Sequence, residues 1–293
     1  MDTESLRSLA RELDLGDIAD ELATLAEWAI RLDYVPERSA GFRATKLGGL
    51  PDLPAGTPWP YASPPLPEAG TPMLFLAQVA LSEVAAFSVW PSELSGGLLS
   101  FFCAGEEGGA YVEDPGGAHV IYTAPEVPLE RSSPPPELGE TLGEVPLHVR
   151  PELTLPGHNA RALEAVGFDP NVIQIEGPEA ERKQRYWELL ERLDRAQGAG
   201  EPRHRLLGHP IPVQGDVFDE IASIGLRGRL NRYPTEEEEL EETPRWRLLL
   251  QVDDDHDRLG VLWGDAGTVY FCIRAEDLAA GRFDGVEVVV QTT

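Results

Sequence analysis

Apolar positions repeat at helical spacing near the start of the chain. Two helices are predicted within residues 4–33, and the apolar stripe of the second consists of Ile18, Leu22, Leu25, Ala29 and Leu32. Asp17 is expected to cap this second helix, and Pro36 is expected to stop it. Residues 1–41 are therefore expected to form a helical segment.

From about residue 42 the pattern changes to short apolar runs between Gly, Pro and Ser, which predicts strands. The expected strands cover residues 73–79, 97–103, 118–124, 147–155, 245–252, 258–263, 267–273 and 286–291. Helices are expected at 178–196, at 215–225 with Asp216 as N-cap, and at 275–281 with Gly281 at the end. These elements predict an α+β fold built mainly on an antiparallel sheet.

Three short motifs recur in the same order. LGGLP (47–51) is echoed by LGHP (207–210), FLAQV (75–79) by LLLQV (248–252), and FFC (101–103) by YFC (270–272). Echoes in one order indicate a degenerate duplication. We expect a first repeat at 42–160 and a second at 161–293, forming one compact unit with the N-terminal helices packed against its sheet. The helix at 215–225 and the run EEEELEE (236–242) would be an insertion in the second repeat, and 132–140 a surface linker.

The stretch KLGGLPDLPAGTPWP, residues 46–60, holds four prolines and three glycines. Leu47, Leu50 and Leu53 recur every third residue, which is the period of polyproline II. Because proline loses little entropy on ordering, this stretch is expected to form an ordered strap over the sheet, pinned by Trp59. Gly48 and Gly49 would allow a tight turn. The alternative is an exposed P-x-x-P ligand.

Taken in order, these motifs resemble the YwqG-like family, a bacterial domain family of unknown function. The motifs that carry the resemblance are KLGGLPDLPAGTPWP, MLFLAQV, GLLSFFC, LGHPIPVQGD, LLLQVD and WGDAGTVYF. The resemblance covers roughly residues 42–291 and implies a duplicated α+β fold in a soluble bacterial protein. It implies no catalytic residues.

The charge balance bears on partners. The chain of 293 residues has a formal net charge of −27, which repels phosphate, so neither nucleic acid nor an anionic membrane is an expected partner. A basic protein is favoured instead, and solubility is the plainer explanation of the charge. The two cysteines, the acidic N-terminus and the shortness of the apolar runs favour the cytoplasm.

Familiar catalytic motifs are missing from the sequence. It has no phosphate-binding loop, no G-x-G-x-x-G, no G-x-S-x-G and no H-E-x-x-H. Common nucleotide-binding, serine hydrolase and zinc protease classes are therefore disfavoured, and no catalytic residue is proposed from the sequence.

One acidic run raises the question of a metal. Asp253, Asp255 and Asp257 alternate as in a calcium loop, but Arg258 stands at the sixth position and Gly264 at the twelfth, where an EF-hand needs glycine and glutamate. The run is either an acidic turn between two strands or a looser divalent-cation site completed by Asp265. No other cofactor is expected.

Two glutamines interrupt apolar strands at corresponding points of the echoes. Gln78 and Gln251 are each expected either to bond backbone within their own repeat or to face a shared cleft. In the second case, Gln214, Asp216 and Trp263 would complete a binding site. A separate candidate is the run beginning with Glu236, Glu237, Glu238 and Glu239, which is either a solvated loop or a docking edge for a basic protein.

These observations favour a non-enzymatic protein-binding role, of an immunity or regulatory kind. The alternatives are an enzyme, or a small-ligand sensor, using an acidic and metal-assisted cleft between the repeats. Carboxylates gathered inside a pocket would favour the enzyme, and an exposed acidic rim would favour the binding protein.

Overall fold

The computed structural model describes the chain except for residues 36–39, 65, 67–68, 105–114, 169–175, 199, 201 and 261–262. In the described part, ten strands form one antiparallel sheet in the order β12-β11-β10-β9-β1-β8-β2-β4-β5-β6. Their bounds are β1 Glu27–Tyr34, β2 Lys46–Leu47, β4 Leu74–Ala80, β5 Leu98–Cys103, β6 Ala118–Thr123, β8 Val145–Thr154, β9 His204–Leu206, β10 Trp246–Asp253, β11 Thr268–Arg274 and β12 Glu287–Gln291. A smaller sheet pairs β3 (Asp52–Pro54) with β7 (Leu129–Arg131). The predicted α+β class with an antiparallel sheet is confirmed.

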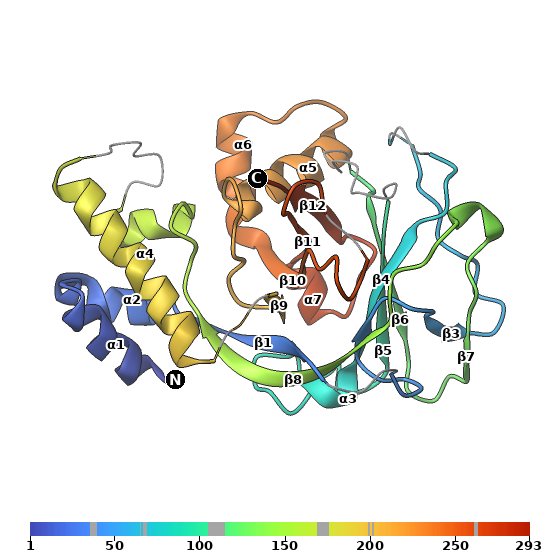
Figure 1. Ribbon diagram of the computed structural model, residues 1–293. Helices are drawn as coiled ribbons and strands as arrows, with labels where there is room; N and C mark the ends of the chain where they lie inside the picture. The colour runs from blue at the N-terminus through green and yellow to red at the C-terminus, as the bar shows by residue number, and fades with distance from the viewer. Residues whose placement is uncertain are drawn as a thin grey trace.

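The strand order is symmetric about the central pair β1 and β8, the long curved ribbons at the bottom of Figure 1. Strands β2, β4, β5 and β6 lie beyond β8, and strands β9, β10, β11 and β12 lie beyond β1. Along the chain, however, β1 precedes β2 and β8 precedes β9. The two leading strands, β1 and β8, are therefore exchanged: β1 pairs with β9, and β8 pairs with β2.

Contacts in the two groups correspond closely. Gln78 of β4 lies opposite Lys46, and Gln251 of β10 lies opposite Arg205. The Lys46 Nζ donates to the carbonyl of Leu50 at 2.7 Å, and the Arg205 Nη1 donates to that of His209, also four residues on, at 3.0 Å. Each of β4 and β10 has an irregularity in its register, between Phe75 and Ala77 and between Leu248 and Leu250.

The turns that follow β2 and β9 also share their backbone conformation. Gly48 and Gly49 have φ of 58° and 69°, and Leu207 and Gly208 have φ of 59° and 67°. In the next strands the register places Phe101 and Phe271 at corresponding positions, because they lie opposite Ala77 and Leu250. The number of residues that separates corresponding positions of β5 and β11 is thus one larger than the FFC and YFC echo indicates. Cys103 and Cys272 therefore do not correspond.

The main core lies between the two strand groups. The Phe101 and Phe271 rings meet there edge to face, with their centroids 5.4 Å apart. The sheet is strongly curved, so its edge strands β6 and β12 approach each other. The backbone N–H of Gly116 donates to Glu287 at 3.1 Å, and the rings of Tyr122 and Phe283 lie 6.1 Å apart. The two groups therefore form one compact body.

A second core belongs to a helical lobe at the left of Figure 1. It comprises α1 (Thr3–Glu12), η1 (Gly16–Ile18), α2 (Ala19–Leu25), η3 (Arg161–Val166) and α4 (Pro178–Ala196). Apolar side chains of these helices pack on one another and on Leu153 and Leu155 at the end of β8. The N-terminal helices thus meet the sheet at one strand end and otherwise pack on helices. None of the described helices combines the length and the apolar character that crossing a bilayer requires.

The prediction of a second N-terminal helix up to Leu32 is wrong. The helix α2 begins after the short turn that contains Asp17 and ends at Leu25, and residues 27–34 form the central strand β1. Ala29 and Leu32 are buried in the sheet instead of lying on a helical stripe. Sheet pairing on both sides of this segment outweighs its helical spacing.

Three more helices belong to the second strand group: α5 (Val217–Leu230), α6 (Glu236–Glu242) and α7 (Ala275–Ala279). Asp216 caps α5 as predicted, since its side chain accepts from the Phe218 N–H at 2.8 Å. Helix α5 covers β10, β11 and β12 with Val217 and Ile221. The remaining short helices are α3 (Leu81–Val84), η2 (Pro136–Leu138) and η4 (Thr243–Arg245). The strand predicted at 258–263 is wrong for its described residues, because residues 256–259 form a turn.

The proline-rich strap is ordered and packed. It supplies β2 and β3, buries Leu47 and Leu53, and ends at Trp59. The Trp59 Nε1 donates to the carbonyl of Met73 at 2.8 Å, and its ring meets Phe102 edge to face at 5.3 Å. Pro51 is buried within the strap, so this stretch does not present an exposed P-x-x-P ligand.

Candidate binding site

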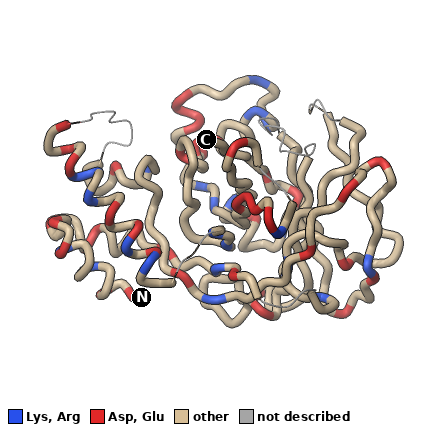
Figure 2. Tube along the Cα trace, in the orientation of Figure 1, with Lys and Arg blue, Asp and Glu red and all other residues tan. Residues whose placement is uncertain are grey.

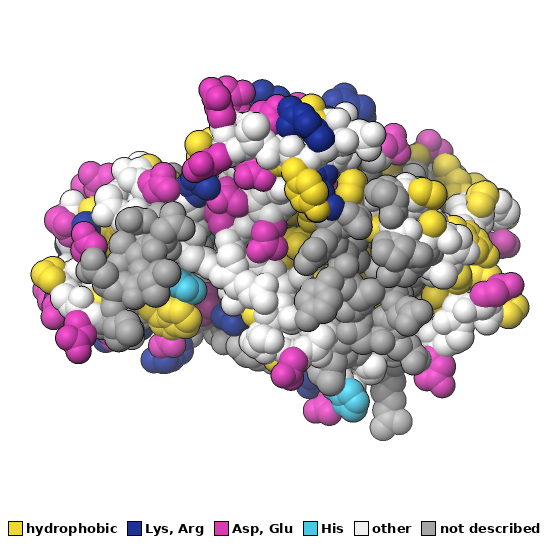
Figure 3. Space-filling view, turned by 90° about the horizontal axis from the view of Figure 1, so that it is seen from above, with side chains coloured by type: hydrophobic (Ala, Val, Ile, Leu, Met, Phe, Trp, Pro, Cys, Tyr) yellow, Lys and Arg dark blue, Asp and Glu magenta, His cyan; other side chains and the backbone are white. Residues whose placement is uncertain are grey.

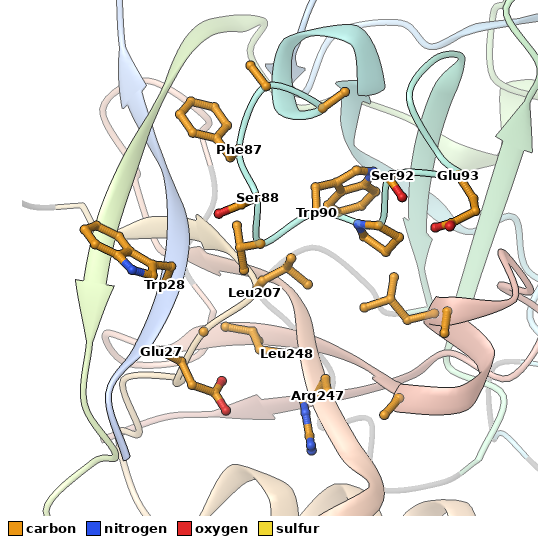
Figure 4. A pocket seen from close by; sticks show the side chains of 18 residues that line it. Glu27, Trp28, Phe87, Ser88, Trp90, Ser92, Glu93, Leu207, Arg247 and Leu248 are labelled. Atoms are coloured by element: carbon orange, nitrogen blue, oxygen red, sulfur yellow. The ribbon is translucent and has the colours of Figure 1, made fainter. Parts of the chain in front are cut away.

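An open groove of about 1100 Å³ lies where the two strand groups meet. Its walls come from the start of β1, from residues 85–93 after α3, from residues 207–208, from β10 and from α7. Figure 4 shows the indoles of Trp28 and Trp90 on opposite sides of the groove, with Phe87 above and Glu27 and Arg247 below. Segments far apart in the sequence thus share one hollow.

The groove presents aromatic and charged groups together. Trp28 is 39% exposed, whereas Trp90 is buried and donates its Nε1–H to the carbonyl of Leu94 at 2.9 Å. Glu27 and Glu93 are exposed, and within the described residues neither carboxylate has an ion-pair partner. Arg247 donates only to the carbonyls of Pro244 and Trp246 in the described chain. This surface suits a flexible ligand with apolar and basic groups.

A second hollow, which we call the inner cavity, has a volume of about 480 Å³. It lies between the helical lobe and the start of α5, and Glu27 and Arg247 line both it and the groove. The predicted site residue Asp216 lies in its wall, where it accepts from the Arg161 N–H at 2.7 Å as well as capping α5. Burial raises the pKa of Asp216.

The two paired glutamines lie away from both hollows, fully buried. The Gln78 side chain accepts from the Asp52 N–H at 3.0 Å and donates to the carbonyl of Ala44 at 2.9 Å. The Gln251 side chain accepts from the Ile211 N–H at 2.9 Å and donates to the carbonyl of Arg203 at 3.0 Å. Each therefore holds the loop of its own strand group, which is the first of the two expectations for these residues.

The other residues of the expected cleft are also separated. Gln214 is exposed on the loop before α5, and its Nε2 donates to the carbonyl of Thr292 at 2.6 Å. Trp263 is buried in the main core. The sequence reasoning missed Gln291, a third buried glutamine that accepts from the Val213 N–H at 2.9 Å and holds this same loop. Its signal in the sequence was an amide inside the apolar run VEVVVQ.

The four candidate metal ligands point to different partners. Asp255 accepts from Tyr34 at 2.6 Å and pairs with Arg258 at 3.3 Å, while Asp253 accepts from the Arg203 N–H and from Thr268. The Asp257 side chain is 97% exposed, and Asp265 lies on an exposed turn. In the part of the chain that the structure describes, no three His, Cys, Asp or Glu side chains gather as metal ligands would.

A buried polar network that the sequence did not predict joins Tyr34, His204 and Asp255. The Asp253 N–H donates to His204 Nδ1 at 3.1 Å, which assigns the ring proton to Nε2. Nε2 then donates to the Tyr34 hydroxyl at 2.7 Å, and that hydroxyl donates to Asp255. Burial lowers the pKa of His204 to about 4. Burial and the bond to Asp255 raise the pKa of Tyr34.

The glutamate run is a helix and not a loop. In α6, Thr235 and Glu238 form a capping box, and Glu238 also pairs with Arg232 at 2.6 Å. Glu242 is buried and pairs with Arg229 and Arg274 at 2.9 and 2.7 Å. Burial opposes ionisation of Glu242, but the hydrogen bonds and charges of Arg274 and Arg229 together outweigh burial, and the pKa of Glu242 is lowered. Glu236 and Glu237 remain exposed. Figure 2 shows α6 as an acidic red segment of the trace.

Figure 3 shows acidic side chains spread over the helical lobe and the middle of the molecule, with a few basic ones between them. The acidity seen in this view is therefore spread over several elements and is not confined to α6. The exposed carboxylates of α6 add to that field without forming a pocket.

Comparison with known proteins identifies the family alone. A family model described as a domain of unknown function (DUF1963) matches residues 45–291, which is most of the chain. No curated protein matches the sequence at a meaningful level of similarity.

Proposed function

Because the chain belongs to the DUF1963 family, which includes the YwqG-like proteins and has no assigned activity, we propose a function from the geometry. We propose that the protein is a non-enzymatic binding protein and that the groove takes a segment of another polypeptide. The observation that carries the proposal is the exposed indole of Trp28 in an open groove that Glu27 and Glu93 also line, neither of them with an ion-pair partner among the described residues.

Aromatic side chains are enriched where proteins bind one another, because they bury a large rigid surface at low entropic cost. Trp28 and Phe87 offer such a surface, and the buried Trp90 lines the opposite side of the groove, with its indole N–H bonded to the carbonyl of Leu94. Glu27 and Glu93 favour a cationic occupant, and so does the net charge of −27. The expected occupant is therefore a basic segment with apolar side chains.

The polar networks support binding over catalysis. His204 is buried at the far end of a closed relay, and each of its ring nitrogens has a protein partner. Asp216 uses both carboxylate oxygens on backbone N–H groups. Both ring nitrogens of His204 are occupied within this relay, and the Asp216 carboxylate holds two backbone N–H groups, so each side chain has a structural role. An immunity or regulatory protein that acts only by binding a segment of its partner needs no general base.

The proposal is tested by selecting peptides from a phage-displayed random library on the immobilised protein and measuring their binding kinetics. Selected peptides should carry Arg or Lys next to aliphatic or aromatic residues. Trp28→Ala should weaken them about tenfold or more, since truncating an aromatic anchor at an interface costs at least this. Trp187→Ala, which removes a similarly exposed indole from α4, should leave binding unchanged.

Salt supplies a second criterion. Glu27→Gln should slow association and make it less sensitive to salt, because exposed charges act mainly through the encounter rate. Enrichment of acidic peptides, or equal loss in the two tryptophan variants, would contradict binding in the groove. The exposed glutamates of α6 give a comparison: Glu236→Gln with Glu237→Gln should alter the encounter rate without affecting dissociation.

We also infer that the two strand groups are degenerate copies. The matching registers, turns and side-chain contacts of β2 to β5 and β9 to β11 support this inference. The symmetry of the sheet relates β1 to β8 and the strands that follow β1 in the chain to those that follow β8. The copies would therefore begin at β1 and β8 instead of at residues 42 and 161. The proposed groove lies where these copies meet.

A further inference from the structure

The inner cavity is lined by a carboxylate and a guanidinium group that are open to a ligand. Glu27 and Arg247 line both this cavity and the groove, and neither forms an ion pair among the described residues. The Arg247 Nη1 donates to the carbonyls of Pro244 and Trp246, which leaves its Nε and Nη2 as free donors within that part of the chain. Figure 4 shows the Glu27 and Arg247 side chains on the same side of the groove, below Leu248.

His209 adds an acceptor to this pair of charges. It lines the cavity and is only 9% exposed. Its Nε2 lies 2.7 Å from the carbonyl oxygen of Leu25, which can only accept, so Nε2 carries the ring proton. Burial lowers the pKa of His209, so the ring is neutral at pH 7 and Nδ1 is an acceptor. Among the described residues Nδ1 has no hydrogen-bond partner, yet it is not one of the polar atoms sealed off without one.

Glu27, His209 and Arg247 lie close to one another. The Thr154 hydroxyl donates to the carbonyl of Glu27 at 2.8 Å and accepts from the His209 N–H at 3.0 Å, which joins the two backbones through one oxygen. After burial, the negative charge of Glu27 raises the pKa of His209 and the positive charge of Arg247 lowers it, so both charges lie within range of the ring. The free polar groups of the cavity are therefore gathered around His209.

The other charged groups of the cavity are occupied. Arg161 donates to both carboxylate oxygens of Asp219, at 2.8 to 3.1 Å, and also lies 3.9 Å from Glu164. The carboxylate of Asp216 accepts two backbone N–H groups. A ligand with one positive and one negative group would thus find its counter-charges in Glu27 and Arg247.

The remaining walls are apolar. They come from α2, from the loop before α5, from the start of α5 and from η4, and consist of Leu25, Pro210, Pro212, Val217, Phe218 and Pro244. The volume of about 480 Å³ lies within the usual range for small-molecule sites. The cavity therefore has room for a compact apolar group beside the charged one.

We propose that the inner cavity binds a free α-amino acid with an apolar side chain. The ammonium group donates to the Glu27 carboxylate and to His209 Nδ1. The carboxylate accepts from the free donors of Arg247, in the two-bond geometry that guanidinium and carboxylate groups favour. The apolar side chain packs against the walls. This inference does not rest on the proposed polypeptide binding, although Glu27 and Arg247 are shared by the two hollows.

The test uses L-phenylalanine as the probe and isothermal titration calorimetry on the full-length protein. L-Phenylalanine should bind at one site per chain. Two ring-matched compounds each lack one charge: L-phenylalaninamide has no carboxylate, and 3-phenylpropionate has no ammonium group. Each should bind about tenfold more weakly than L-phenylalanine or worse, because each leaves a charged protein group without its hydrogen-bonded partner.

Substitutions assign each charge of the ligand to its partner. Arg247→Gln should remove the preference for L-phenylalanine over L-phenylalaninamide and keep the preference over 3-phenylpropionate. Glu27→Gln should reduce the preference over 3-phenylpropionate and keep the other. The matched control is Glu164→Gln, which removes another carboxylate of the cavity wall, one near Arg161, and should leave both preferences unchanged.

Two further substitutions separate the cavity from the groove. Ala162→Phe narrows the inner cavity from an exposed position of η3, so it should abolish L-phenylalanine binding and spare the selected peptides. Ala279→Phe narrows the groove instead, so it should weaken the peptides and spare L-phenylalanine. Circular dichroism checks that each variant is folded. The proposal is overturned if L-phenylalanine does not bind, if the three compounds bind alike, if Glu27→Gln and Arg247→Gln leave both preferences intact, or if a folded Ala162→Phe binds like the wild type. Peptide binding is measured separately, so failure at one site does not imply failure at the other.

Discussion

Single buried charges in the centre of the sheet decide much of the stability. Glu152 is fully buried between Arg31 and Arg205, with N to O separations of 3.7 and 3.1 Å. The two guanidinium groups lie at facing positions of β1 and β9, so they repel each other unless a carboxylate separates them. The carboxylate of Glu152 is therefore essential to this arrangement.

Glu152→Gln should destabilise the protein by about 3 to 5 kcal/mol, because the buried Arg205 loses its ion-pair partner and Arg31 is left with Asp33 alone. Urea unfolding followed by circular dichroism measures this change. The matched control is Glu181→Gln, which breaks an exposed pair with Arg185 on α4 and should cost no more than about 0.5 kcal/mol. Similar midpoints for the two variants would show that the buried triad contributes little.

His204 should make stability depend on pH in a defined direction. Its folded pKa of about 4 lies below the unfolded value, so the unfolded chain takes up a proton first as the pH falls. Stability is thus retained above about pH 6.5 and is lost progressively down to about pH 4, with about 2 kcal/mol lost at pH 5 from this residue alone. Carboxylates titrating lower add to the loss near pH 4.

His204→Thr separates this contribution. The corresponding residue of the other strand group, Thr45, accepts the Ala80 N–H through its hydroxyl at 3.0 Å, as His204 accepts the Asp253 N–H. Threonine should therefore keep this bond but remove the titration, and the difference in unfolding free energy between pH 7 and pH 5 should shrink by about 2 kcal/mol. An unchanged difference would mean that other groups carry the pH dependence.

At the scale of elements, the strap depends on a turn in which Gly48 lies too close to another backbone segment to carry a side chain. A Cβ on Gly48 would lie 2.1 Å from the carbonyl oxygen of Gly143, and φ there is 58°. Gly56, in the same strap, has φ of 75° but open space around its Cα. Gly56→Ala should thus cost only about 1 kcal/mol, the usual penalty for a left-handed alanine. Gly48→Ala should cost several times more, since backbone must also move.

Thermal unfolding of the two variants, followed by circular dichroism, measures this difference. If both variants melt alike, the turn yields easily and the strap does not depend on Gly48.

The sequence predicted elements well where one local pattern matched the final environment. Strands β4, β5, β10 and β11 are short apolar runs between turn residues, and each is buried as such runs require. Strand β1 was missed because its period-two pattern of Trp28, Ile30, Leu32 and Tyr34 overlaps a helical stripe. Only pairing with β8 and β9, more than a hundred residues away, decides between the two.

Helix α6 shows the same limit for charge. Adjacent glutamates repel, which predicts a solvated loop. The helix forms because Thr235 and Glu238 cap it and because Arg229 and Arg274 from other elements neutralise Glu242.

The candidate binding site could not be predicted from local sequence for a related reason. The groove joins β1 to residues 85–93 and to α7, and no motif in the sequence marks that juxtaposition.

At the scale of the whole molecule, the exchange of leading strands ties the two strand groups together. Strand β8 lies beside β2, β1 lies beside β9, and the two pair with each other along their length from Glu27 to Tyr34. The main core also draws side chains from both groups. If the chain were divided between β7 and β8, the first fragment would hold β2 without β8, and the second would hold β9 without β1.

Cutting the chain after Gly139, in the segment expected from its sequence to be a surface linker, tests this interdependence. Fragments 1–139 and 140–293 should each lack a cooperative unfolding transition when isolated, because each loses a central strand and half of the main core. Expressed together, they should copurify and unfold in one transition, since the pairings of β1 with β8 and β9 re-form between chains. A dispersed NMR spectrum from either isolated fragment would show that a strand group folds alone. In that case the exchanged strands would be an addition to two independent units, and the groove between them would open and close with the motion of those units.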